Sequence, residues 1–277
     1  MIEMYPFQIL VLVLTGVVAG FASGLLGVGG AFIMVPVQFW TVKSMGVDPT
    51  IAVRISFGTG LLVLLPTAFS GALAHHRKGA VVWKAGAILG ITGATASFLG
   101  AYVASNLSER VLTTAFGCVS IVLAVRMLTS GAPLSGQARA EGVSRYVLWG
   151  VLFGLVSGII GVGGGGLMIP VLVSFLGFSL HEAVGTSAAL MIFTALGGSV
   201  SYLINGLGVR GLPPYSTGYL NWLQFALLAG TSIPMAVLGA RVAHLLSSNK
   251  LRMIFALVLL CISLKMMGVF SWLKLPI

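Results

Sequence analysis

Long apolar runs, separated by short polar stretches, follow one another along the whole chain. Runs such as residues 9–22 are continuously apolar, whereas the strands of a membrane β-barrel alternate apolar and polar positions. A helical crossing takes about 20 residues, so the pattern predicts an all-α polytopic membrane protein with about 8 to 10 membrane segments. The runs cover approximately residues 7–26, 31–42, 50–74, 80–105, 110–129, 146–160, 165–177, 183–205, 219–246 and 251–272.

Composition supports a membrane protein and excludes a soluble domain. The 277 residues are 58% apolar and only 7% charged, with a mean hydropathy of +1.08, whereas a soluble domain carries about 25% charged residues. The net charge of +10 does not indicate nucleic acid, because the basic residues are sparse and lie mostly in loops. Residues 1–6 lack the basic segment of a secretory signal, so the first run is expected to be a permanent helix.

An internal repeat organises the chain. Residues 16–37 read GVVAGFASGLLGVGGAFIMVPV and residues 150–171 read GVLFGLVSGIIGVGGGGLMIPV, with 12 identities in 22 positions. The similarity resumes in collinear order further on, where residues 52–56 align with 183–187. Such self-similarity indicates duplication of one structural unit. We therefore predict a first transmembrane repeat at 1–130, a polar cytoplasmic linker at 131–145 and a second transmembrane repeat at 146–277.

The second apolar run of each repeat is short for a full crossing. If it crosses, each repeat has five crossings and the two repeats are inverted in the membrane; if it is re-entrant, each has four and they are parallel. Either count gathers nine of the 15 Lys and Arg residues on the side of loop 75–78 and the linker. The positive-inside rule places that side in the cytoplasm. We favour inverted repeats.

Glycine clusters precede both short runs, at residues 27–30 and 161–166. The second cluster formally matches a dinucleotide-binding fingerprint, but the preceding strand and following acid that this motif requires are missing. Adjacent glycines weaken a helix, and a helix that begins after such a break directs free N–H groups and its positive dipole end at the gap. Two breaks can therefore converge on one anion near the bilayer centre. The alternative is close helix packing through small residues.

The predicted anion site combines these glycines with polar residues near the next helices. Ser56, Thr186 and Ser187 are suitable donors, although hydroxyls at helix starts are also ordinary N-caps. Arg54 lies in an apolar run, where a basic residue is costly unless paired, solvated or functional; snorkelling to the interface is the alternative. The candidate substrate-binding residues are Gly29, Gly30, Gly163, Gly164, Gly165, Arg54, Ser56, Thr186 and Ser187.

The motifs GLLGVGGAFIMVPV and GIIGVGGGGLMIPVL, each followed by an Ala-Val-x-x-Ser step, resemble those of the TauE/SafE sulfite-exporter family. Both repeats match, so the resemblance covers nearly the whole chain. It implies secondary transport, in the direction of export, of sulfite or organosulfonates across the bacterial inner membrane. The first copy departs from the Gly-Thr-Ser step, with Arg54 and Ile55 in its place. The resemblance assigns function to Gly27, Gly29, Gly30, Gly161, Gly163, Gly164, Thr186 and Ser187.

Other functions remain open at this point. A passive anion channel, or an uptake permease for other organic anions, fits the same pattern, since five acidic residues among 277 suit an anion pathway better than a cation pathway. An intramembrane enzyme would need a catalytic constellation, and the sequence offers none. We expect no metal site and no cofactor, because His75 and His76 stand without a spaced Cys/His or carboxylate set. The expected partners are the lipid bilayer and a small anionic solute.

Overall fold

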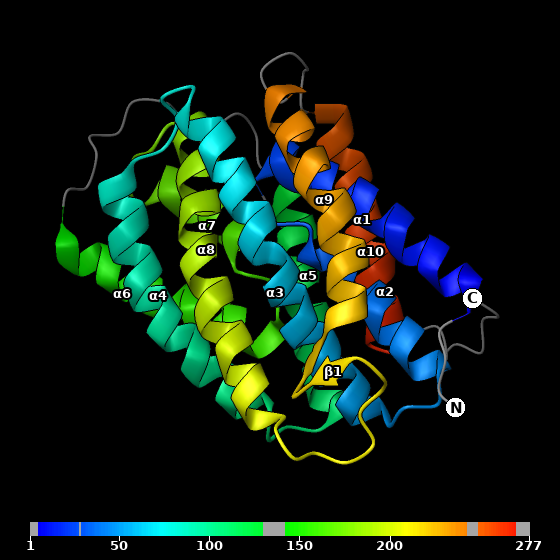
Figure 1. Cartoon of the computed structure of the whole chain (residues 1–277). Coiled ribbons are helices and arrows are strands. Elements are labelled where there is room, and N and C mark those ends of the chain that lie inside the picture. Colours follow the sequence, from blue (N-terminus) through cyan, green and yellow to red (C-terminus); the bar gives the residue numbers. More distant parts are fainter. Residues whose placement is uncertain (1–4, 28, 130–141, 243–248, 270–277) are drawn as a thin grey trace.

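The computed structural model describes residues 5–27, 29–129, 142–242 and 249–269, which form ten helices and one short hairpin (Figure 1). Most of the predicted linker, residues 131–141, lies outside the described residues. The first five helices are α1 (Pro6–Leu26), α2 (Ala31–Ser44), α3 (Pro49–His76), α4 (Trp83–Ala104) and α5 (Glu109–Thr129). The remaining elements are α6 (Val143–Ile160), α7 (Gly165–Ser174), α8 (Leu180–Asn205), β1 (Ser216–Thr217), β2 (Leu220–Asn221), α9 (Trp222–Val242) and α10 (Asn249–Met266).

Seven of the helices in the described residues are long and apolar enough to cross a membrane, namely α1, α3, α4, α5, α6, α8 and α9. The outer faces carry large exposed apolar side chains, such as Leu10, Leu14 and Val18 along α1. These residues recur every four positions, so they form one stripe on the helix. A stripe of this kind suits contact with lipid rather than water. The prediction of an all-α polytopic membrane protein is confirmed.

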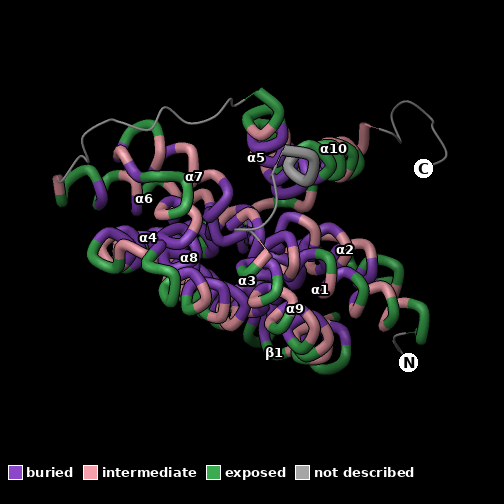
Figure 2. Tube along the Cα trace, turned by 90° about the horizontal axis from the view of Figure 1, so that it is seen from above, coloured by how far each residue is buried: buried purple, intermediate pink, exposed green. Residues whose placement is uncertain are grey.

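Helices α3 and α8 form the centre of the molecule and are the most buried of the long helices (Figure 2). Phe57 of α3 makes an edge contact with Tyr202 of α8, with ring centroids 6.5 Å apart. A Cβ at Gly198 would lie 2.6 Å from the Cδ1 atom of Leu61. Residue numbers therefore rise along α3 as they fall along α8, so the two central helices run antiparallel.

Two parallel helix pairs flank this centre, α1 with α9 and α4 with α6. Gly20 of α1 lies so close to α9 that an added Cβ would be 2.5 Å from the Cα atom of Ser232. Gly154 of α6 is equally close to α4, where a Cβ would lie 2.7 Å from the Cα atom of Gly93. Small residues at four-residue spacing allow such approach. The glycines of this spacing are Gly16, Gly20 and Gly24 on α1 and Gly150, Gly154 and Gly158 on α6.

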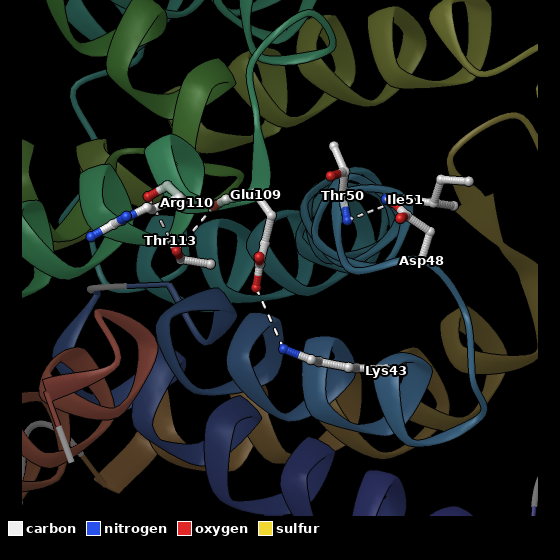
Figure 3. A network of polar contacts seen from close by, with 7 residues as sticks. All are labelled: Lys43, Asp48, Thr50, Ile51, Glu109, Arg110 and Thr113. Carbon is white, nitrogen blue, oxygen red and sulfur yellow. Dashed lines mark hydrogen bonds and ion pairs between the residues drawn. The ribbon is translucent and has the colours of Figure 1, made fainter. Parts of the chain in front are cut away.

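Polar contacts at the helix ends position α2 and α3 (Figure 3). Asp48 caps α3, because its side chain accepts hydrogen bonds from the amides of Thr50 (2.9 Å) and Ile51 (3.2 Å). Lys43, in the last turn of α2, forms a 3.5 Å ion pair with Glu109 at the start of α5. The far end of α2 is thus held against α5, while its first residue follows the glycine break.

Candidate anion-binding site

Glycines with positive φ end the first helix of each half. Gly27 (φ 64°) terminates α1 and Gly161 (φ 69°) terminates α6, both in the left-handed conformation. Gly29 and Gly163 then take φ values of 82° and 73°. L residues with a side chain rarely adopt these values. The chain therefore leaves the helix at corresponding places in the two halves, and a short helix, α2 or α7, begins within a few residues.

The two breaks contact the same pair of side chains, Leu64 of α3 and Met191 of α8. A Cβ at Gly29 would lie 3.0 Å from the Sδ atom of Met191 and 3.6 Å from Cδ2 of Leu64. A Cβ at Gly163 would lie 2.7 Å from Cδ1 of Leu64 and 3.6 Å from Sδ of Met191. Leu64 and Met191 are buried near the middle of their helices. The structure thus brings both breaks together halfway along the two central helices.

The first backbone amides of each short helix have no hydrogen-bond acceptor within that helix. The first hydrogen bond of α7 joins the Met168 amide to the Gly164 carbonyl at 3.1 Å, and that of α2 joins the Ile33 amide to the Gly30 carbonyl at 3.0 Å. The earlier amides of each helix have no intrahelical acceptor. Together with the helix dipole they give each start about half a positive charge. The sulfur of Met191 packs directly on Gly165, so its thioether covers the start of α7.

Two hydroxyls of α8 hold the glycine breaks in place. Ser187 is fully buried, and its hydroxyl lies 3.2 Å from the Gly27 carbonyl, as well as 2.8 Å from the carbonyl of Val184 in its own helix. Thr194 donates to the Gly163 carbonyl at 3.0 Å. The structure therefore brings Ser187 to the first break and adds Thr194 at the second.

The other two predicted hydroxyls serve different contacts. Thr186 accepts a hydrogen bond from the Val82 amide at 3.1 Å, which fixes the start of α4. Ser56 donates within its own helix to the Ala52 carbonyl at 2.7 Å. Both side chains are fully buried, and the partners of these hydrogen bonds lie outside the glycine breaks.

Arg54 joins loops at one end of the molecule. Its Nη1 atom donates to the Tyr219 hydroxyl at 3.0 Å, and its Nη2 atom donates to the Leu107 carbonyl at 2.9 Å. The guanidinium also lies 5.7 Å from the centroid of the Tyr219 ring, within cation–π range. Arg54 thus connects the start of α3 with the α4–α5 loop and the hairpin, and it is not brought to the glycine breaks.

Sequence reasoning did not identify Leu64, Met191 or Thr194 as part of this region. Leu64 and Met191 are apolar residues in apolar runs, so nothing in the sequence distinguishes them from residues that face lipid. Thr194 carries a weak signal, since it is a hydroxyl in the middle of a membrane run, but its partner becomes evident only in the folded structure.

The fold and the two breaks define a multi-pass helical membrane protein with broken helices at its centre, an architecture that secondary transporters use. The chain belongs to the TauE/SafE family: the family model described as "Sulfite exporter TauE/SafE" matches residues 12–266. The match extends from within α1 to the end of α10 and includes both breaks.

Relatives of the chain carry transporter names. A "Probable membrane transporter protein" of Haemophilus influenzae is 28% identical over 263 residues, which cover 95% of this chain and 99% of the relative. The "Probable membrane transporter protein YunE" of Bacillus subtilis is 25% identical, over 94% of this chain and 98% of the relative. A "Probable membrane transporter protein" of Methanocaldococcus jannaschii is 26% identical over 90% of this chain and 91% of the relative. No solved structure matches the chain significantly.

Proposed function

We propose that this protein is a secondary transporter that exports small sulfur-containing anions, such as sulfite or organosulfonates, across the bacterial inner membrane. The family name supports the substrate class. The structural observation that carries the proposal is the meeting of both glycine breaks at Leu64 and Met191. Two helix starts that converge at one place form a site for an anion.

The anion would lie between the starts of α2 and α7, near the middle of α3 and α8. The backbone amides at Gly30, Gly164 and Gly165 would be its donors, and Ser187 would support the first break through the Gly27 carbonyl. We leave Arg54 out of this site because its Nη1 and Nη2 donors are bound to Tyr219 and Leu107.

Alternating access would follow from an inverted pair of repeats, 1–130 and 146–277. Their third helices, α3 and α8, run antiparallel, and the first helix of each half packs along the fourth helix of the other. An exchange of conformation between two such halves opens a central site first to one side and then to the other. Leu64 and Met191 pack against both breaks and would close the site on one side.

Counterflow in proteoliposomes tests transport. Vesicles are loaded with unlabelled sulfite and diluted into a trace of radiolabelled sulfite, and the experiment is repeated with sulfoacetate and chloride. A transporter with alternating access accumulates label transiently above equilibrium, because the internal substrate drives exchange. Uptake that relaxes without an overshoot would identify a passive channel, and uptake no faster than in empty vesicles would refute anion transport altogether.

Two variants test whether anion counterflow depends on the glycine breaks. Gly163→Leu places a side chain against Leu64 in a left-handed conformation, and Ser187→Ala removes the contact with the Gly27 carbonyl, so both should reduce counterflow. The control is Ser105→Ala, which removes a hydroxyl bonded to the Ala101 carbonyl at 2.8 Å, at the end of α4. Equal loss of counterflow in Ser105→Ala would show that general destabilisation explains the effect.

A further inference from the structure

A buried glutamine beside the second break has no hydrogen-bond partner among the described residues. Gln38 lies in the middle of α2 and is 0% exposed. Neither its amide nitrogen nor its amide oxygen has a partner among the residues that the structure describes. Buried polar groups almost always form hydrogen bonds, and an unpaired amide destabilises a fold. Such a group indicates a partner that arrives from outside the chain.

The Gln38 amide lies close to the end of α6. Gly60 of α3 has no side chain, and a Cβ at that position would lie 3.8 Å from Nε2 of Gln38 and 3.4 Å from the Gly161 carbonyl oxygen. The amide nitrogen and this carbonyl thus both lie against α3 at Gly60, together with Cγ2 of Val35, which a Cβ there would meet at 2.7 Å. Gly161 is the residue at which α6 ends and the second break begins. Gln38 therefore reaches from α2, which follows the first break, to the second break.

A second unpartnered group lies at the same break. Ser157 is in the last turn of α6 and is 0% exposed, and its hydroxyl has no partner in the described part of the chain. Its Cβ atom is 3.5 Å from the position that a Cβ would take at Gly164, the N-cap of α7. The hydroxyl of Ser187 at the first break, in contrast, lies within hydrogen-bond distance of the carbonyl oxygens of Gly27 and Val184.

We propose, building on the transport function proposed above, that Gln38 and Ser157 donate hydrogen bonds to the anion, and that the site selects an oxyanion with a single negative charge. Both side chains are neutral donors at the second break: Gln38 lies near the end of α6, and Ser157 lies beside the N-cap of α7, where backbone amides are free. Oxyanion oxygens accept such bonds strongly because the acceptor carries charge. The anion supplies the partner that the two buried groups lack.

Because Gln38 and Ser157 are neutral, the positive charge at the site comes from the helix starts, and this charge determines which anion is preferred. Two helix starts contribute about half a positive charge each, which together balance one negative charge. The cost of removing an ion from water rises steeply with its charge. Arg54 binds Tyr219 and Leu107 near the first turns of α3. A dianion at the break would therefore remain undercompensated, whereas a monoanion would be balanced.

Methanesulfonate and sulfate test this preference, since both are tetrahedral and differ by one charge. Binding is measured as thermal stabilisation of the purified protein at constant ionic strength, with chloride as the background salt. Sulfate also stabilises proteins non-specifically, so each shift is compared with that of Gln38→Met. We expect the wild type to bind methanesulfonate at least about tenfold more tightly than sulfate.

Gln38→Met keeps the shape of the side chain and removes the amide. Because it also removes an unpaired buried group, the ligand-free variant should melt at a higher temperature than the wild type, while its affinity for methanesulfonate falls about ten- to a hundredfold. A purely structural amide would give no loss of affinity. Ser157→Ala should weaken binding in the same direction, without a loss of ligand-free stability.

Matched controls remove equally buried groups elsewhere. Gln224→Met on α9 and Ser120→Ala on α5 each remove a buried side chain whose oxygen has no partner in the described part of the chain. Neither variant should change the affinity for methanesulfonate. Unchanged affinity in Gln38→Met and Ser157→Ala, with intact wild-type binding, would overturn the inference but leave the transport proposal standing. Tighter binding of sulfate than of methanesulfonate would overturn the charge preference. A wild type that no anion stabilises would refute the proposed function itself.

Discussion

Replacement of Gly163 by alanine should destabilise the folded protein by about 2 kcal/mol. The residue has a φ of 73°, and a left-handed conformation costs an alanine about 1–2 kcal/mol relative to glycine. The new Cβ would also lie 2.7 Å from Cδ1 of Leu64. The end of the Leu64 side chain must then shift, and a shift that takes it about 30° from its rotamer adds about 0.5–1.5 kcal/mol.

Gly71→Ala is the matched control, because Gly71 lies inside α3 and a Cβ there would meet nothing within 4 Å. Alanine is favoured over glycine in a helix by about 1 kcal/mol, so this variant should be as stable as the wild type or more stable. The two glycine-to-alanine changes thus have opposite expected signs.

The assay is thermal unfolding of the ligand-free protein in detergent. A loss of 2 kcal/mol corresponds to a fall of about 4–8 °C in a chain of this size. If Gly163→Ala melted at or above the wild-type temperature, the break could not be held in the left-handed conformation, and the geometry from which the anion site is argued would be wrong.

Three further variants probe the contacts around the site. Gly20→Val should prevent the protein from accumulating in the membrane, because the backbone of α9 blocks the space for a side chain; normal accumulation on an immunoblot would contradict this packing. Arg54→Met should lower the free energy of unfolding by about 1–3 kcal/mol, because it leaves the Tyr219 hydroxyl and the Leu107 carbonyl without their donors. The anion affinity, measured by thermal shift, should stay within about twofold of the wild type. Lys43→Met should change the free energy of unfolding by less than about 1 kcal/mol, because the side chains of Lys43 and Glu109 are 48% and 32% exposed and solvent screens their ion pair. A larger loss that persists in high salt would show that this ion pair is not screened by solvent.

The helices and the breaks were predictable from sequence because both depend on local chemistry. Continuous apolar runs specify membrane helices, and a cluster of glycines specifies where a helix stops. The runs at 31–42 and 165–177 correspond closely to α2 and α7. The hairpin between α8 and α9 was not predicted, since its strands are only two residues each.

The composition of the site was less predictable, because it depends on which way side chains face. Arg54 and Ser56 are neighbours in sequence, but two positions along a helix point in different directions. Arg54 binds the loops and Ser56 bonds within α3. The sequence around Gln38 suggests no role for this residue. Its proposed role rests on the absence of a hydrogen-bond partner among the described residues, which only the tertiary structure reveals.

The crossed pairing of α1 with α9 and α4 with α6 also bears on how the protein is made. The most extensive helix contacts among the described residues join one half to the other. The N-terminal half is synthesised first, so the glycine-lined face of α1 stays exposed to lipid or to the insertion machinery until α9 emerges from the ribosome. Translation that stops in the linker leaves an unfinished surface for quality-control proteases, whereas two halves produced as separate chains have the complementary faces needed to assemble.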